Sequence, residues 1–152
     1  MAENCRFAFA VHILSALALH PEEPLTSEQL AQSVNTNPVV VRRLLGELAE
    51  ASLVESQRGP GGGARLAQPA AKISLAQIYR AAAGEIAPFG EHPNEPAQAC
   101  PVGRGIRRVL ESVAARARHA VEQEYEAISL LDVVREINEP QPRLPQPRHK
   151  SS

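Results

Sequence analysis

Apolar positions in the first third of the chain recur every three or four residues, which is the spacing of amphipathic helices. They predict a first helix over residues 7–19, which ends before two prolines. A short second helix follows, with Thr26 or Ser27 placed to accept backbone N–H bonds as its N-cap. Residues 35–37 then favour a turn. The pattern therefore predicts two helices that lead into a tight turn.

A third helix is expected to begin at Pro38, because proline suits the first helical position. One face of this helix is apolar and is expected to point into the core, and it consists of Val41, Leu44, Leu45 and Leu48. Arg42 and Arg43 lie off that stripe. The third helix therefore presents a face with two arginines to something other than the core.

Residues 53–56 and 64–67 read as two strands of a hairpin, and the turn between them is Arg58-Gly59-Pro60-Gly61-Gly62-Gly63. Ser74 is expected to cap a fourth helix that runs to Ala83 and stops at Gly84. A loop rich in proline and glycine covers residues 87–105. The chain thus alternates short elements with one long loop.

The longest helix is expected over residues 105–128, followed by a short helix over 130–137 that Ser129 caps. The apolar stripe of the long helix is longer than one small domain needs to cover, so we expect this helix to pack against the same helix of a second copy. The residues assigned to this dimer interface are Ile106, Leu110, Val113, Ala117 and Val121.

The fold class that follows is mostly α, namely a winged helix-turn-helix domain with a small β-hairpin wing and a long dimerisation helix. Four segments are expected. They are a DNA-binding domain over 1–84, a loop with Cys100 over 85–104, the dimerisation helix with a short last helix over 105–137, and a disordered tail over 138–152.

Composition agrees with a compact helical chain, since 43% of the residues are hydrophobic and 3% are aromatic. The sequence has no apolar run long enough to cross a bilayer, so we expect a cytoplasmic protein without membrane contact. Catalytic triads, zinc-helix motifs and phosphate-binding loops are also missing from the sequence, so an enzyme is not expected.

The order of two short helices, a turn, a third helix and a glycine-tipped hairpin predicts double-stranded DNA as the partner. Arg42 and Arg43 are the candidates for reading base edges, beside Val39 on the same helix, while Thr36 and Asn37 are candidates for phosphate contacts at its N-terminus. Each of these residues has a simpler interpretation as a soluble surface residue or a helix cap.

The wing contributes four further candidates for DNA contact, which are Arg58, Gly61, Gly62 and Arg65. Arg58 and Arg65 flank the tip, where the glycines let a partner's backbone approach closely. Cross-strand pairing on the surface is the alternative for the arginines. The turn is not a P-loop, because Ala64 and Arg65 follow its last glycine instead of lysine and a hydroxyl residue.

A rival hypothesis is that the winged helix serves as a protein–protein adaptor that does not bind DNA. Residues 1–80 carry seven basic and seven acidic side chains, so the predicted DNA-binding half is not basic overall. The surface around the candidate arginines distinguishes the two hypotheses, because DNA requires it to be positive.

Several of these motifs together resemble the Rrf2 type of bacterial transcriptional regulator. The resemblance rests on Asn37-Pro38-Val39-Val40-Val41-Arg42-Arg43-Leu44-Leu45, Ala51-Ser52-Leu53-Val54, the wing turn 58–63, Ile73-Ser74-Leu75, and Cys100-Pro101-Val102-Gly103. It covers the chain to about residue 137 and implies a homodimeric winged-helix repressor. The resemblance also implies a near-palindromic operator, with the wing arginine in the minor groove.

Some regulators of that type hold an iron–sulfur cluster with three cysteines in the loop before the long helix. This chain departs from that pattern, because Cys100 is the single cysteine in that stretch and Cys5 lies far away in sequence. No cofactor and no metal site are therefore expected. Cys100 remains a candidate redox thiol near a helix N-terminus, and the alternative is a small residue that packs the loop against the first helix.

Overall fold

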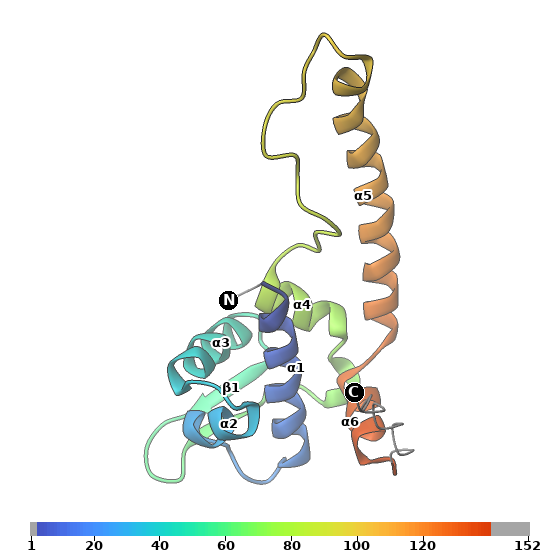
Figure 1. Ribbon diagram of the computed structural model, residues 1–152. Coiled ribbons are helices and arrows are strands. Elements are labelled where there is room, and N and C mark those ends of the chain that lie inside the picture. The colour runs from blue at the N-terminus through green and yellow to red at the C-terminus, as the bar shows by residue number, and fades with distance from the viewer. Residues whose placement is uncertain (1–2, 141–152) are drawn as a thin grey trace, which may run out of the picture.

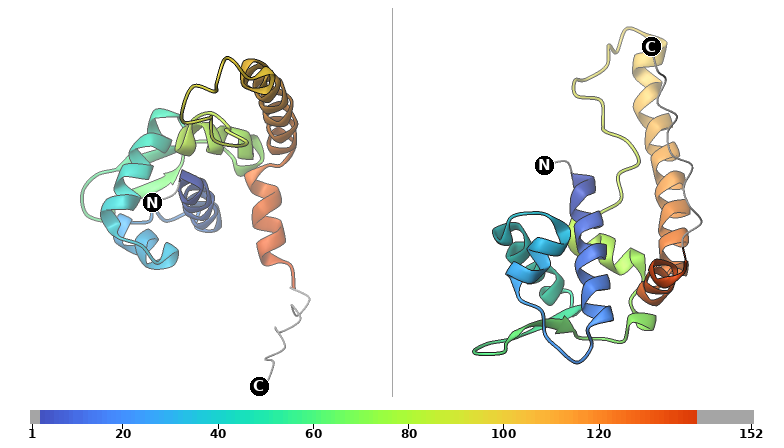
Figure 2. Two further views of the ribbon diagram at one scale, coloured as in Figure 1. Left: turned by 45° about the horizontal axis from the view of Figure 1, so that its top comes forward. Right: turned by 60° about the horizontal axis from the view of Figure 1, so that its bottom comes forward.

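The computed structural model describes residues 3–140 and is mostly helical (Figure 1). Its elements in chain order are α1 (Glu3–Leu19), α2 (Ser27–Val34), α3 (Pro38–Glu50), β1 (Val54–Gln57), β2 (Gly63–Leu66), the 3-10 turn η1 (Ala70–Lys72), α4 (Leu75–Ala83), α5 (Pro101–Ala127) and α6 (Leu130–Asn138). A compact head contains every element except α5, which protrudes from it with the loop that precedes it (Figures 1 and 2). The predicted winged-helix fold class is confirmed.

Local hydrogen bonds explain where α2 and α3 begin. The Thr26 hydroxyl accepts from the Gln29 backbone N–H, and the Gln29 side chain accepts from the Thr26 N–H in return, which makes a capping box. Asn35 takes a left-handed conformation with φ 63°, and Asn37 then caps α3 by accepting from the Val39 N–H at 2.8 Å. Polar residues between the helices thus set the turn that orients α3.

Buried aliphatic side chains from α1, α2 and α3 meet in one core. The predicted apolar stripe of α3 is confirmed, since Val41, Leu44, Leu45 and Leu48 are all buried. From α1 the buried residues are Ala10, Ile13, Leu14, Ser15 and Leu17. Arg42 and Arg43 are exposed on the other side of α3, as the pattern predicted. The core therefore holds α3 by one face and leaves the other exposed.

The hairpin pairs β1 with β2 in antiparallel register, from Val54 opposite Leu66 to Gln57 opposite Gly63. Leu25, just before α2, adds a third short pairing, because its N–H and carbonyl both bond to Ala64, at 2.9 and 2.8 Å. Both strands are displaced by one residue from the predicted ranges. The wing is therefore attached through Leu25 to the segment that enters the helix-turn-helix.

Two helix boundaries differ from the prediction by about one turn. α1 begins at Glu3 instead of residue 7, and α5 begins at Pro101 instead of residue 105. Pro101 occupies the first turn, where a proline costs no hydrogen bond, so the glycines at 103 and 105 lie inside the helix. Consequently Cys100 is the N-cap residue of α5, and the loop ends there. Of the predicted tail, Asn138 belongs to α6 and residues 141–152 lie outside the described residues.

Three aromatic rings join α5 to the head at the helix's lower end. Phe7 of α1 lies 5.1 Å from Tyr79 of α4 and 5.3 Å from Tyr125 of α5, measured between ring centroids. Tyr79 and Tyr125 are themselves 5.8 Å apart. Each such aromatic pair stabilises the fold by roughly 0.5–1.5 kcal/mol in addition to the contribution of its buried apolar area. The base of α5 is therefore packed, while its upper part extends away.

After α5 the chain returns to the head as α6. The Leu75 N–H donates to the Ile128 carbonyl at 2.9 Å, and the Leu130 N–H donates to the Ile73 carbonyl at 2.8 Å. Leu130 and Val134 are buried in the core beside α1. Within residues 3–140, no helix has both the length and the apolar character that a membrane span requires.

Candidate nucleic-acid interface

α2, α3 and the hairpin lie on the side of the head away from α5 in both views (Figures 1 and 2). The outer face of α3 carries Val39, Arg42, Arg43 and Gly46, and Val39 is 64% exposed. A Cβ built on Gly46 meets nothing within 4 Å. This face is therefore unobstructed by the described residues, and an approaching surface can reach its backbone at Gly46.

Arg42 is paired with a carboxylate of the neighbouring helix. Its guanidinium lies 2.6 Å from Glu28 in the first turn of α2, and both side chains are more than half exposed. The Glu28 backbone N–H and the Arg42 guanidinium hold the pKa of the Glu28 carboxyl below its usual range. Arg42 must therefore exchange Glu28 for a base or phosphate if it is to contact DNA.

Arg43 has a looser intramolecular contact. Its Nε lies 3.8 Å from Glu47 one turn later, and its side chain is 77% exposed. The second carboxylate oxygen of Glu47 is engaged by Arg6 of α1. Because Glu47 already has this partner, Arg43 keeps much of its freedom to bind elsewhere.

Thr36 and Asn37 lie at the N-terminus of α3, where the sequence placed them. The Thr36 N–H donates to the Ala31 carbonyl at 3.0 Å, and the Asn37 side chain is occupied with the Val39 N–H. Both residues therefore serve as structural caps. A phosphate contact by either would use atoms not engaged in those bonds.

At the wing, Arg58 is exposed and makes no hydrogen bond or ion pair with any described residue. Gly61 has φ 74° with open space around it, as befits a turn. Gly62 is different, because a Cβ there would lie 2.2 Å from the Gln57 carbonyl oxygen. Gly62 is therefore required by the turn itself, whatever the wing contacts.

Arg65 takes another position than Arg58. It is half-buried and lines a hollow of about 470 Å³ with Pro21 and Glu55, and its Nε is buried without a hydrogen-bond partner among the described residues. The structure therefore directs Arg65 toward the end of α1, while Arg58 remains at the wing turn.

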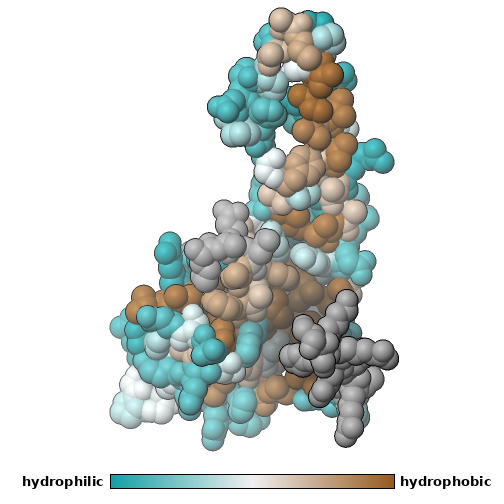
Figure 3. All heavy atoms as spheres, viewed as in Figure 1, coloured by the Kyte–Doolittle hydropathy of each residue, from teal (hydrophilic) through white to brown (hydrophobic). Residues whose placement is uncertain are grey.

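The apolar face of α5 is incompletely covered by its own chain. Ile106, Leu110, Ala117 and Val121 are half-buried, whereas Val113 is 43% and Val109 49% exposed. None of the residues of α5 is fully buried. Figure 3 shows hydrophobic side chains gathered along this protruding helix. The helix thus displays the apolar face that the sequence assigned to dimerisation.

The loop before α5 is tied to the helix by arginines. Arg104 donates to the Gln98 carbonyl at 3.0 Å, Arg107 lies 2.9 Å from Glu95, and Arg118 donates to the Ile86 carbonyl at 2.9 Å. At Gly103 a Cβ would lie 2.0 Å from the Ala97 carbonyl oxygen, so the loop packs directly on the helix. The loop is therefore attached to α5 near its two ends, at Ile86 and at residues 95–98.

Cys100 is exposed at the N-terminus of α5, and Cys5 is exposed on α1. The interpretation of Cys100 as a residue packed against the first helix is therefore wrong. The described residues contain no group of three or more histidine, cysteine or acidic side chains that could hold a metal ion. The surroundings of Cys100 supply arginines instead of further thiolates, so they do not fit an iron–sulfur cluster.

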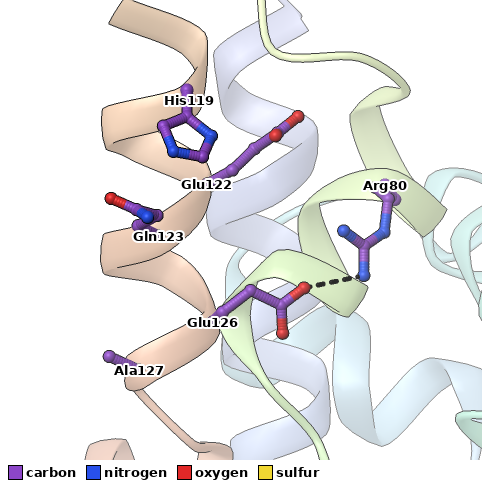
Figure 4. Close-up of a pocket in the computed structure, with 6 residues that line it drawn as sticks. All are labelled: Arg80, His119, Glu122, Gln123, Glu126 and Ala127. Carbon is purple, nitrogen blue, oxygen red and sulfur yellow. Dashed lines mark hydrogen bonds and ion pairs between the residues drawn. The ribbon is translucent and has the colours of Figure 1, made fainter.

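A shallow hollow of about 580 Å³ lies between α4 and α5, where Arg80 and Glu126 form an ion pair of 3.1 Å (Figure 4). His119, Glu122 and Gln123 line it along α5. Arg80 and Glu126 neutralise each other, and the hollow is open to solvent. The ion pair therefore links α4 to α5 at the edge of this hollow.

Sequence reasoning missed the carboxylates that face the arginines. The i,i+4 spacing of Arg43 and Glu47 is visible in the sequence and could have signalled that pair. Glu28 and Arg6 reach α3 from other helices, 14 and 41 positions away from their partners. No local pattern announces such contacts.

The chain is similar to known bacterial transcriptional regulators. Residues 4–146 match the family model Rrf2, described as iron-dependent transcriptional regulator. A Bacillus subtilis protein named as an HTH-type transcriptional regulator, YwnA, is 40% identical over 134 residues, which cover 88% of this chain and 98% of YwnA. A Neisseria meningitidis serogroup A protein of the same class, NMA1593, is 41% identical over 75 residues, or 49% of this chain and 51% of that protein.

Solved structures give the same result. A crystal structure described as that of a DNA binding protein has a TM-score of 0.66 and 39% identity, and the match covers 84% of this chain and 97% of that one. CymR, the global cysteine regulator of B. subtilis, has a TM-score of 0.65 and 26% identity over 86% of this chain and 94% of its own. T. potens IscR shares the fold, with a TM-score of 0.65 over 90% of both chains at 23% identity. Together with the matched family model, these similarities show that the chain belongs to the Rrf2 family of transcriptional regulators, which are not enzymes.

Proposed function

We propose that this regulator is a homodimeric repressor that binds a near-palindromic operator through α3 and the wing. The exposed arginine-bearing face of α3 is the observation that carries the proposal, because the core holds α3 by its opposite face. In this proposal residues 1–84 bind DNA, residues 85–104 form the loop with Cys100, and residues 105–137 join the two copies. A regulator that binds chromosomal DNA works in the bacterial cytoplasm, and we place it there on that ground.

Within this arrangement Arg43 reads base edges in the major groove, and Arg42 does so after it leaves Glu28. Arg58 enters the minor groove or contacts phosphates, which its exposure and lack of a described partner support. Arg65 is a weaker candidate, because its side chain is half-buried toward α1. Val39 and Gly46 allow the helix backbone to approach the groove.

Dimerisation is supported by the uncovered apolar face of α5. Two copies of that face would cover each other about a two-fold axis. The axis would hold two α3 helices at the separation of successive major grooves, about 34 Å. A near-palindromic operator follows from that symmetry.

Cys100 is exposed at the start of α5 and is the thiol that we assign to oxidation. The described residues do not assemble a ligand set for iron.

Selection of bound fragments from a genomic DNA library, with and without peroxide, tests the proposal. We expect fragments with dyad symmetry, and we expect peroxide to release them from the wild-type protein but not from Cys100→Ser. Arg58→Gln should weaken binding to all fragments, whereas Arg43→Gln should also broaden the recovered sequence. Arg80→Gln is the matched control, since it removes an exposed arginine that pairs with α5.

Recovery of no enriched fragment at low salt would overturn DNA binding and favour the adaptor hypothesis. Equal release of wild type and Cys100→Ser by peroxide would overturn the role of the thiol alone.

A further inference from the structure

Glu47 is shared by two arginines that come from different helices. One carboxylate oxygen is bound by Arg6 of α1, and the other faces Arg43 at 3.8 Å. Arg6 and Glu47 are 24% and 29% exposed, whereas Arg43 is 77% exposed. The better-shielded pair is therefore Arg6 with Glu47, and Arg43 is the outer and weaker partner.

The position of Arg6 does not depend on Glu47 alone. Its Nε donates to the Ala82 carbonyl at 2.8 Å, in the last turn of α4. The C-terminal end of a helix attracts a cation, so this contact holds the guanidinium where it meets Glu47. Arg6 thus connects the end of α4 to the outer side of α3.

We infer that Arg6 is a positioning residue for DNA recognition, which holds Glu47 and thereby keeps Arg43 available to the bases. Without Arg6, the nearest described cation to Glu47 is Arg43 on the next turn of the same helix. That i,i+4 geometry favours a direct pair. Arg43 would then be neutralised within α3, and its guanidinium would have to leave a carboxylate before reaching a base.

The contrast with Arg42 supports this assignment. Arg42 lies 2.6 Å from Glu28, which contacts no second cation among residues 3–140. Of the two arginines on the outer face of α3, Arg43 is therefore the one whose carboxylate is diverted by a third group. The structure thereby distinguishes two neighbouring arginines that the sequence treats alike.

The inference rests on the proposed DNA binding and is tested with two probes. One is a duplex that carries the site recovered by the wild-type protein, and the other is the same duplex with both half-sites scrambled. Discrimination is measured as the dissociation constant for the scrambled duplex divided by that for the duplex with the site. If the wild-type ratio is near one, the proposed function fails, and that result is distinct from a failure of the Arg6 assignment.

With wild-type discrimination established, Arg6→Gln should lower the ratio by roughly two- to fivefold, the scale of an exposed ion pair. Adding Glu47→Gln to Arg6→Gln should restore the ratio to that of Glu47→Gln alone. In an Arg43→Gln background, Arg6→Gln should change the ratio no further, because the pair acts through Arg43. Failure of Glu47→Gln to rescue, or an equal effect of Arg6→Gln in both backgrounds, would overturn the assignment.

A measurement without DNA keeps the test independent of affinity and folding. The Nε–H proton of Arg43 should exchange with water more slowly in Arg6→Gln than in the wild type, and the double variant should reverse this change. Thermal unfolding of each variant verifies the fold. If Arg6→Gln does not fold, Arg6→Lys replaces it, because one ammonium cannot reproduce the two-acceptor contact of the guanidinium. Unchanged Arg43 exchange in a folded Arg6 variant would contradict the inference.

Discussion

Glycine has opposite roles at Gly63 and Gly46. Gly63 opens β2 with φ 151°, and a Cβ there would lie 2.6 Å from the Leu25 carbonyl oxygen. That oxygen accepts a hydrogen bond from the Ala64 N–H, so moving it away would break this bond. Gly46 lies inside α3 with open space around it, where glycine costs helix stability. One glycine is thus required by the fold, and the other weakens the helix that carries it.

We expect Gly63→Ala to lower the free energy of unfolding by about 1–3 kcal/mol, because it combines backbone strain with a steric clash. Urea denaturation at one fixed protein concentration measures this change. Gly46→Ala is the matched substitution and should raise the free energy by about 0.5–1 kcal/mol. A Gly63→Ala protein as stable as the wild type would contradict the close approach to Leu25.

Residue exposure could largely be predicted from spacing. The stripe of α3 is buried, and Arg42, Arg43 and Arg58 are exposed, as their positions indicated. The partner of Arg42 could not be predicted, since Glu28 approaches from another helix, and the same holds for the contact of Arg6 with Glu47. The position of Arg65 could not be predicted either. It flanks the wing turn as Arg58 does, but its side chain is directed toward the end of α1, which is distant in sequence.

At the scale of elements, three helices begin with reciprocal capping boxes. They pair Thr26 with Gln29, Ser74 with Gln77, and Ser129 with Asp132. These signals are local in sequence, and the starts of α2, α4 and α6 agree with the prediction. α5 lacks such a side-chain cap, and the predicted start at residue 105 is later than the observed start at Pro101. Its glycines suggested a loop, but Gly103 is needed inside the helix to admit the Ala97 carbonyl.

The cap of α6 predicts a pH dependence. The backbone N–H of Ser129 donates to the Asp132 carboxylate, and this bond, followed by the side-chain interaction with Ser129, lowers the pKa of that carboxyl in the folded state. A lowered folded pKa adds stability above the unfolded pKa, and this stability is lost as the pH falls through the folded value. Asp132→Asn should therefore lower the melting temperature at neutral pH, and the difference from wild type should shrink below about pH 4.

Thermal unfolding followed by circular dichroism between about pH 7 and pH 3 tests this expectation. Glu136→Gln is the control, because its side chain is exposed on the same helix and makes no ion pair with a described residue. A difference between Asp132→Asn and wild type that stays constant over this range would contradict the assigned cap.

For the whole molecule, the sequence predicted the head and the long helix but not how they are joined. The rings of Phe7, Tyr79 and Tyr125 meet at the base of α5, although they lie far apart along the chain. Their helical spacing predicts that each ring lies on the apolar face of its own helix, but a pattern within one helix cannot show that the three rings meet. The quaternary arrangement is likewise a proposal that the uncovered face of α5 supports.

That proposal predicts that Val109→Glu with Val113→Glu yields a monomer. Both side chains are exposed in the single chain, so the head should remain folded, but two carboxylates would be buried without partners in a dimer. Sedimentation velocity at micromolar concentration measures the mass, and DNA affinity should fall with it. Ala115→Glu adds one carboxylate on another side of α5 and should remain dimeric. A dimeric double variant would contradict this interface.

The strand-like pairing of residues 73–75 with residues 128–130 fixes both ends of a long excursion of the chain at neighbouring points. A segment closed in this way can change in length at small entropic cost, since that cost grows only with the logarithm of loop size. Helical turns can therefore be gained or lost beyond the aromatic cluster while the pairing of the head stays intact. Among relatives, the length of α5 can therefore evolve separately from α3 and the wing, the surface proposed to bind DNA.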